Sequence, residues 1–237
     1  MKYLKINCIL MLNLSITFFT INGYAGIPTV QEIPVEAIFS PRGYDSLDSS
    51  ELVVKGALPN ACHKNPKVEV TRISDTFEIK LTSLFYDPSN PFCPEVIVPF
   101  VKTIDLGQLD AGVYKIKYMN VNGVDEIIEY KVSEPRLGND KNEIYANVEH
   151  IELRLEQGKV ILHGHNPSDC FVLKNVRVID NGRKTVSILP RMEQVRDFCP
   201  MKMVAFQIEV DLPEVDSSEK TLLHVRSMKG DSVNTIY

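Results

Sequence analysis

A short pattern of turn residues and cysteine occurs twice in this chain and constrains its fold more than any other feature. Residues 56–62 read GALPNAC and residues 164–170 read GHNPSDC, so Gly-x-x-Pro-x-x-Cys recurs at a separation of 108 positions. The second cysteines also have matching surroundings, because Phe-Cys-Pro occurs at 92–94 and again at 198–200. A period of this length is the size of a domain and is too long for a solenoid repeat. The sequence therefore predicts two copies of one domain.

The cysteines that follow the first 25 residues number four: Cys62, Cys93, Cys170 and Cys199. An even number of cysteines indicates two disulfides if the chain reaches an oxidising compartment, and four cysteines allow three connectivities. The repeat selects one of them, because each copy should own one bridge. We therefore predict Cys62–Cys93 and Cys170–Cys199. Each bridge closes a loop of about 30 residues. Closing such a loop lowers the entropy of the unfolded chain and should stabilise the fold by about 3–4 kcal/mol.

The first 25 residues have the regions of a secretory signal in their usual order. A basic start (MKYLK) precedes an apolar run at 6–21 and the segment NGYA, which ends in a small residue. We expect cleavage after Ala25. The alternative, an uncleaved membrane anchor, is disfavoured because the run is short and contains Asn7 and Asn13. Cys8 begins the apolar run and so does not fit a lipid-bearing cysteine. No second run of spanning length follows, and a periplasmic or secreted location is expected.

Alternation of apolar and polar residues predicts β-strands in both copies. The alternating segments are 67–71, 76–81, 114–118, 129–132, 176–178, 204–210 and 223–225. Period-two runs between Pro, Gly, Asn and Asp are typical of half-buried antiparallel strands. The expected fold class is all-β, with two tandem immunoglobulin-like antiparallel β-sandwiches after a cleaved signal peptide. The predicted divisions are a signal peptide at 1–25, a first sandwich at 26–133, a linker at 134–142 and a second sandwich at 143–237.

One turn in the first copy refines this expectation. The stretch LGQLDAGVY at 106–114 places a glycine turn two residues before Tyr114, which opens a strand. This arrangement resembles the tyrosine corner of immunoglobulin-like sandwiches. The aligned residue of the second copy is Lys220, so the corner is lost or altered there, and the absence of Trp excludes the antibody-type core. The polar segment 40–50 is expected to be an exposed loop.

The phrases GALPNAC, FCP and LGQLDAGVY resemble a type of exported bacterial protein with tandem disulfide-containing immunoglobulin-like β-sandwich domains. In these domains Gly-x-Leu-Pro-x-x-Cys, Cys-Pro and Leu-x-x-Gly-x-Tyr recur in this order. The resemblance covers most of the first copy and is weaker in the second. It implies a disulfide-stapled periplasmic or secreted domain, and it implies no catalytic activity.

The sequence contains no established catalytic motif. Gly-x-Ser-x-Gly, His-Glu-x-x-His, a Walker loop, the dinucleotide-binding glycines and Cys-x-x-Cys are all absent from the sequence. We therefore expect a protein that is not an enzyme and has no cofactor. His163 and His165 are the best metal candidates, because residues i and i+2 share a face of a strand, with His150 or Asp169 as a third ligand. The interpretation we favour is that both histidines are ordinary residues of a surface turn.

Two further parts of the sequence are weaker candidates for chemistry. His63 stands beside Cys62 and could activate a thiolate, but an export signal favours the oxidised cysteine. The acidic segment 211–219 could bind calcium, but it lacks the spaced acids and the glycine of an EF-hand loop. We expect this segment to be a solvated loop.

The segment LFYDPSNPF at 84–92 is the candidate binding loop, since three aromatic residues and two prolines stand beside Cys93. Rigid aromatic side chains on an anchored loop suit a binding tip. Its candidate residues are Tyr86, Phe85 and Phe92. We expect Phe85 and Phe92 to plug the end of the core and Tyr86 to be exposed. The tail 226–237 is expected to provide a final edge strand.

A net charge of −5 argues against nucleic acid and against an anionic membrane surface as partners. The leading hypothesis is a non-catalytic exported protein that binds a protein or a cell-envelope component through loops or edge strands. One alternative is a structural envelope or appendage subunit, which edge-strand pairing would mark. The other is an unrecognised metal-dependent hydrolase that uses the His163/His165 region.

Overall fold

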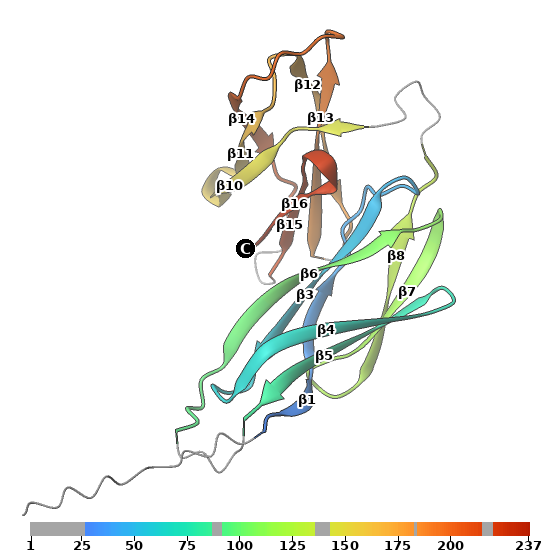
Figure 1. Cartoon of the computed structure of the whole chain (residues 1–237), viewed down its shortest axis with the longest axis vertical. Helices are drawn as coiled ribbons and strands as arrows, with labels where there is room; N and C mark the ends of the chain where they lie inside the picture. The colour runs from blue at the N-terminus through green and yellow to red at the C-terminus, as the bar shows by residue number, and fades with distance from the viewer. Residues whose placement is uncertain (1–26, 87–91, 136–142, 183, 215–219) are drawn as a thin grey trace, which may run out of the picture.

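In the computed structural model of the chain, nearly all regular secondary structure is β-strand, and the strands form four sheets (Figure 1). It describes residues 27–86, 92–135, 143–182, 184–214 and 220–237. The predicted signal peptide and most of the predicted linker lie outside these ranges. The helices in the described ranges are two short 3-10 turns, Leu155–Gln157 and Met228–Gly230, and none of them is long and apolar enough to cross a membrane. The all-β prediction is confirmed.

Eight strands between residues 29 and 132 form the first two sheets, which we call the N-terminal half. The strands are β1 (Thr29–Ile33), β2 (Val35–Phe39), β3 (Ser49–Leu58), β4 (His63–Ile73), β5 (Thr76–Phe85), β6 (Val98–Gln108), β7 (Gly112–Met119) and β8 (Asp125–Val132). One sheet has the order β1-β5-β7-β8, with β4 also paired to β5, and the other has the order β2-β3-β6. The consecutive strands β1 and β2 therefore belong to different sheets.

Eight further strands between residues 144 and 236 form the other two sheets, which we call the C-terminal half. The strands are β9 (Ile144–Tyr145), β10 (Val148–Arg154), β11 (Lys159–Asn166), β12 (Phe171–Asp180), β13 (Thr185–Gln194), β14 (Val204–Asp211), β15 (Leu222–Arg226) and β16 (Ser232–Ile236). The orders are β12-β13-β15-β16, with β9 also paired to β13, and β10-β11-β14. Each strand thus has the same neighbours as its counterpart eight strands earlier. The repeat in the sequence recurs in the pairing of the strands.

One pair of strands in each half is parallel. β5 pairs with β7 and β13 pairs with β15 in parallel, whereas the other pairs of named strands are antiparallel. The cause is the route of the chain, which leaves β5, forms β6 in the opposite sheet and returns as β7 in the same direction. The expectation of wholly antiparallel sheets did not include this pair.

The apolar positions of the predicted strands form a core in each half. In the N-terminal half, Leu52 and Val54 of β3 pack with Ile79 and Leu81 of β5. In the C-terminal half a second cluster contains Val160, Leu162, Ile188, Val210 and Val225. The predicted tyrosine corner is present, because the hydroxyl of buried Tyr114 donates to the carbonyl oxygen of Asp110 at 2.9 Å.

The segment 40–50, predicted to be an exposed loop, instead packs against the C-terminal half. The carbonyl oxygen of Ser40 accepts a hydrogen bond from Asn181 Nδ2 at 2.8 Å, and the amide of Arg42 donates to Ser187 Oγ at 3.0 Å. Tyr44 is buried. The prediction of exposure was wrong because the polar groups of this segment find their partners in the other half of the chain.

An ion pair is buried where the two halves meet. The guanidinium of Arg226, whose side chain is 2% exposed, contacts the Asp48 carboxylate at 2.7 Å and 3.3 Å. It also stacks over the rings of Tyr44 and Tyr145, at 4.4 Å and 4.8 Å from their centroids. A small apolar cluster of Phe39, Val53 and Leu222 lies at the same junction.

A histidine completes this junction. Nε2 of His224 lies 3.0 Å from the hydroxyl of Tyr44, and Nδ1 lies 2.9 Å from Asn234 Oδ1 and 3.2 Å from the Glu51 carboxylate. Burial lowers the pKa of His224 to about 4. A neutral ring with its proton on Nδ1 donates to Asn234 and accepts from Tyr44. The two halves are thus joined by a packed and hydrogen-bonded interface. Whether either half folds alone, as the division at 26–133 and 143–237 supposes, stays a prediction.

Candidate functional site

Two disulfides anchor the loops on which the candidate site is built. Cys62 is paired with Cys93 and Cys170 with Cys199, with Cα atoms 5.4 Å and 5.6 Å apart. The pairing is the one predicted from the repeat. Each first cysteine lies in the turn after a long strand, β3 or β11, and each second cysteine precedes the next strand of the same sheet, β6 or β14.

The first disulfide carries an exposed apolar tip, which we call the N-terminal tip. It consists of Phe92, Val96, Ile97 and Val98, whose side chains are exposed. Phe92, next to Cys93, is 83% exposed. The expectation that Phe92 plugs the core was therefore wrong, because its ring lies in solvent beside a half-buried Cys93.

The other two predicted loop residues are less exposed than Phe92. Phe85 is half-buried and packs on His63, with ring centroids 4.7 Å apart. Tyr86 is exposed as predicted, at 37%, and its amide donates to the carbonyl oxygen of Cys62. The loop residues 87–91 lie outside the described ranges. Of the three aromatic residues, Phe92 offers the largest apolar surface to a partner.

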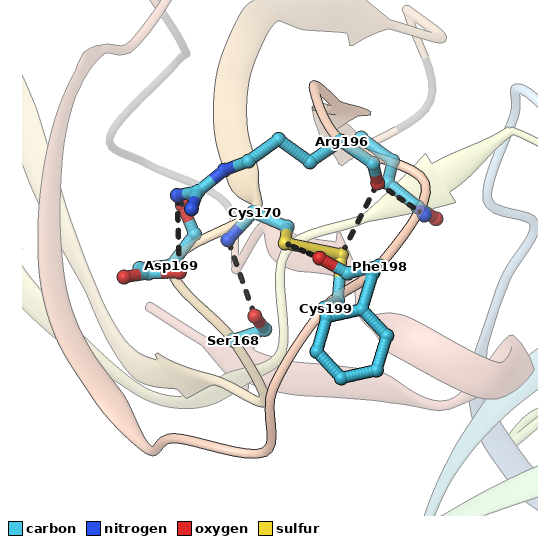
Figure 2. Close-up of a disulfide and its surroundings, with 7 residues drawn as sticks. Ser168, Asp169, Cys170, Arg196, Phe198 and Cys199 are labelled. Atoms are coloured by element: carbon cyan, nitrogen blue, oxygen red, sulfur yellow. Dashed lines mark hydrogen bonds and ion pairs between the residues drawn. A yellow bond between two sulfur atoms is a disulfide. The ribbon is translucent and has the colours of Figure 1, made fainter.

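The second disulfide carries a corresponding apolar tip, which we call the C-terminal tip. It consists of Val195, Phe198, Met201 and Met203, all exposed, with Phe198 at 82% and Met201 at 97%. Figure 2 shows Phe198 beside the bridge, with its carbonyl oxygen 3.4 Å from Cys170 Sγ. The guanidinium of Arg196 reaches across to the Asp169 carboxylate at 3.1 Å and so ties the loop of the tip to the turn that holds Cys170.

The two tips are held by equivalent backbone bonds. The amide of Tyr86 donates to the Cys62 carbonyl oxygen at 3.1 Å, and the amide of Val195 donates to the Cys170 carbonyl oxygen at 2.9 Å. The sequence analysis missed the residues of the C-terminal tip. The sequence did contain a signal for this tip, because the two Phe-Cys-Pro strings align Phe198 with Phe92. Both side chains are exposed.

The histidines predicted as metal candidates lie on the outer face of the sheet β10-β11-β14. His163 and His165 point to the same face of β11, as their spacing predicts, since their neighbours Leu162, Gly164 and Asn166 are buried. Each imidazole pairs with a glutamate of β10. His163 Nε2 lies 3.0 Å from Glu152, and His165 Nδ1 lies 3.1 Å from Glu149.

The proposed third ligands do not complete a metal site. His150 lies opposite His163, with ring centroids 5.8 Å apart, while the Asp169 carboxylate is bound to Arg196. Among the described residues, no group of three or more His, Cys, Asp or Glu side chains is placed to hold a metal ion. A shallow depression of about 490 Å³ beside these histidines is bordered by Ala205 and Gln207 of β14.

The two weaker sequence candidates have structural roles in the described part of the chain. Cys62 is disulfide-bonded and so provides no thiolate, and Nδ1 of buried His63 lies 2.7 Å from Ser83 Oγ. Burial lowers the pKa of His63. In the acidic segment 211–219, Asp211 pairs with Lys159 at 3.7 Å, and residues 215–219 lie outside the described ranges.

Comparison with known proteins agrees with the fold of the N-terminal half. A family model described as the ORF11 beta-sandwich domain matches residues 52–132, which run from β3 to the end of β8. No curated protein and no solved structure matches the chain. The match identifies a β-sandwich domain in this range.

Proposed function

We propose that the chain is a non-catalytic, exported interaction protein that binds a protein of the cell envelope through its two disulfide-anchored tips. The observation that carries this proposal is the exposure of Phe92 and Phe198, 83% and 82%, at equivalent positions of the two halves. Each is accompanied by further exposed apolar side chains on the same tip. Exposed apolar side chains gathered on one loop are the kind of surface that marks an interaction site.

The chemistry of the tips favours a protein as the partner. Aromatic residues and methionine are enriched at protein interfaces, and the tips carry Phe92, Phe198, Met201 and Met203. The disulfides and the backbone bonds at Tyr86 and Val195 restrict the loops before any partner arrives. Binding therefore costs less conformational entropy than it would with free loops.

The positions of the tips favour contact with two sites at once. Figure 1 shows the segment that leads into β6 at the lower end of the molecule and the segment that leads into β14 at the upper end. The buried junction between the halves, with Arg226 and Asp48 at its centre, holds these ends apart. The chain could therefore bind two sites on one partner, or link two partner molecules, with one tip at each site.

Export and the immunoglobulin-like description belong to the same proposal. Disulfides persist in oxidising compartments, which agrees with the signal peptide predicted at 1–25. The paired sheets and the tyrosine corner at Tyr114 support an immunoglobulin-like description, although the parallel pair β5–β7 departs from that pattern.

The test is affinity capture from the native envelope with the exported protein as bait. A double variant, Phe92→Ser with Phe198→Ser, removes the aromatic residues of both tips. A control variant, Val113→Ser, changes an exposed apolar residue on β7 instead. We expect a partner that the wild type and the control capture and that the double variant loses. Equal recovery with all three baits would contradict a role for the tips.

A further inference from the structure

The edge strand β14 is open to pairing with another strand. It pairs with β11 alone among the described strands, over Val204–Asp211, and the register runs without a bulge. Its first five residues, Val204–Ile208, include no charged residue and no proline. An edge of this kind presents a row of unpaired backbone N–H and C=O groups, and such a row selects an extended polypeptide as its ligand.

Other long edge strands of the described ranges carry protection against such pairing. β4 contains Pro66 and a register shift, and shifts also interrupt β2, β6, β10 and β12. β8 carries four charged residues, and Ser133, which follows it, is hydrogen-bonded to Tyr44 and Ser46. β1 and β16 have five residues each. Bulges, prolines, charges and short length are the usual devices against edge pairing, and β14 has none of them in its first five residues.

The direction of the free backbone groups follows from the ladder. The amide of Leu212 donates to the carbonyl oxygen of Gly158 at 2.8 Å, which extends the β11–β14 ladder by one pair. Since paired positions alternate in an antiparallel ladder, residues 204, 206, 208 and 210 bond to β11. The backbone groups of Ala205, Gln207 and Glu209 therefore point to the free edge.

The equivalent strand of the N-terminal half, β6, carries a residue that prevents edge pairing. Through the 106-position offset of the repeat, Ala205 corresponds to Pro99 of β6. Pro99 removes the outward N–H at the same place and so blocks a partner strand. Of the two equivalent strands β6 and β14, both within the described ranges, β14 is the one without this proline.

We propose that β14 pairs with β14 of a second molecule of this chain, antiparallel and centred on Gln207. The two-fold pairing places Glu209 opposite Ala205 and Asp211 opposite Met203, so no carboxylates oppose each other. The half-buried rings of Phe206 lie on the inner face, where the added strand would cover them. The two three-stranded sheets join into one six-stranded sheet. This inference rests on the backbone edge of β14 and not on the aromatic residues of the tips, although Met203 of the C-terminal tip lies at the end of the proposed pairing. It fits the alternative of a structural subunit.

The test is cross-linking with a short bifunctional thiol reagent, in variants of the exported protein that each carry one added free cysteine beside the two disulfides. In the proposed register the two positions 207 face each other, whereas the two positions 209 are about 14 Å apart along the strands. We expect Gln207→Cys to form covalent dimers at least about tenfold faster than Glu209→Cys. Wild-type protein controls for background.

A second pair of variants tests whether the edge mediates the link. Ala205→Pro, added to Gln207→Cys, should suppress cross-linking, because it copies Pro99 and leaves the β11 ladder intact. Val101→Pro, at the equivalent of position 207 in the N-terminal half, should leave cross-linking unchanged. Cross-linking at 207 that is no faster than at 209, or that is unaffected by Ala205→Pro, would overturn the proposal.

Discussion

Removing the carboxylate of Asp48 should destabilise the whole protein, because it leaves the buried charge of Arg226 without its partner. The Arg226 side chain is 2% exposed and the Asp48 side chain 22%, so water cannot replace the two contacts at 2.7 Å and 3.3 Å. Breaking one side of a buried ion pair costs about 3–5 kcal/mol. Because Asp48 is partly exposed and two tyrosine rings still face the guanidinium, we expect about 3 kcal/mol for Asp48→Ala.

The assay is urea denaturation, in which the midpoint should fall without a change in slope. Two further variants make the result specific. Asp125→Ala removes the partner of Lys117 in an exposed pair, 2.9 Å apart, and should cost less than about 1 kcal/mol. The double variant Asp48→Ala/Arg226→Met removes both charges and should be more stable than Asp48→Ala alone. A cost for Asp48→Ala no larger than that for Asp125→Ala would refute the reasoning.

Three further predictions concern single residues. Tyr114→Phe removes the hydrogen bond to Asp110 and should lower the free energy of unfolding by about 1 kcal/mol in urea denaturation; an unchanged midpoint would contradict the tyrosine corner. Gly164→Ala would place a Cβ 2.0 Å from the backbone oxygen of Asn147, and we expect a loss of at least about 2 kcal/mol or no folded protein in a thermal melt. His224 has a pKa of about 4 when folded and about 6.5 when unfolded, so its contribution is present above pH 6.5 and is lost as the pH falls toward 4. Denaturation at several pH values should show a loss of up to about 3 kcal/mol that is smaller in His224→Gln; equal pH dependence in the two proteins would contradict this account.

Much of the fold could be predicted because the informative signals were local or repeated. Alternation predicted strands that the structure contains, such as 67–71 within β4 and 204–210 within β14. The disulfide pairing followed from the repeat, since a strand order shared by both halves brings each pair of cysteines together. The tyrosine corner at Tyr114 was predicted from the nine-residue stretch 106–114, which contains the turn and the start of the strand.

The failures concern residues whose environment depends on distant parts of the chain. The segment 40–50 is polar and rich in turn formers, yet Tyr44 is buried by His224 and Arg226, about 180 positions further along. Nothing within the segment indicates this partner. β6 lies in the opposite sheet, which makes β5 and β7 parallel. The alternation of apolar and polar residues predicts a strand but does not show to which sheet the strand belongs.

The candidate site was predicted in part. The aromatic loop beside Cys93 was singled out from its composition, but the side of the disulfide on which Phe92 lies depends on the backbone geometry of the bridge. The alignment of Phe92 with Phe198 was sufficient to locate the second tip. The alignment alone does not show that both rings are exposed, and this exposure is what makes the two positions candidate binding sites.

The most direct test of the tips as binding sites is photo-cross-linking in the native envelope. A photoreactive phenylalanine analogue replaces Phe92 in one protein, Phe198 in a second and the exposed Val113 of β7 in a third. The account predicts adducts with an envelope protein from positions 92 and 198 and none of that protein from position 113. Adducts from position 113 alone, or equal adducts from all three positions, would contradict it.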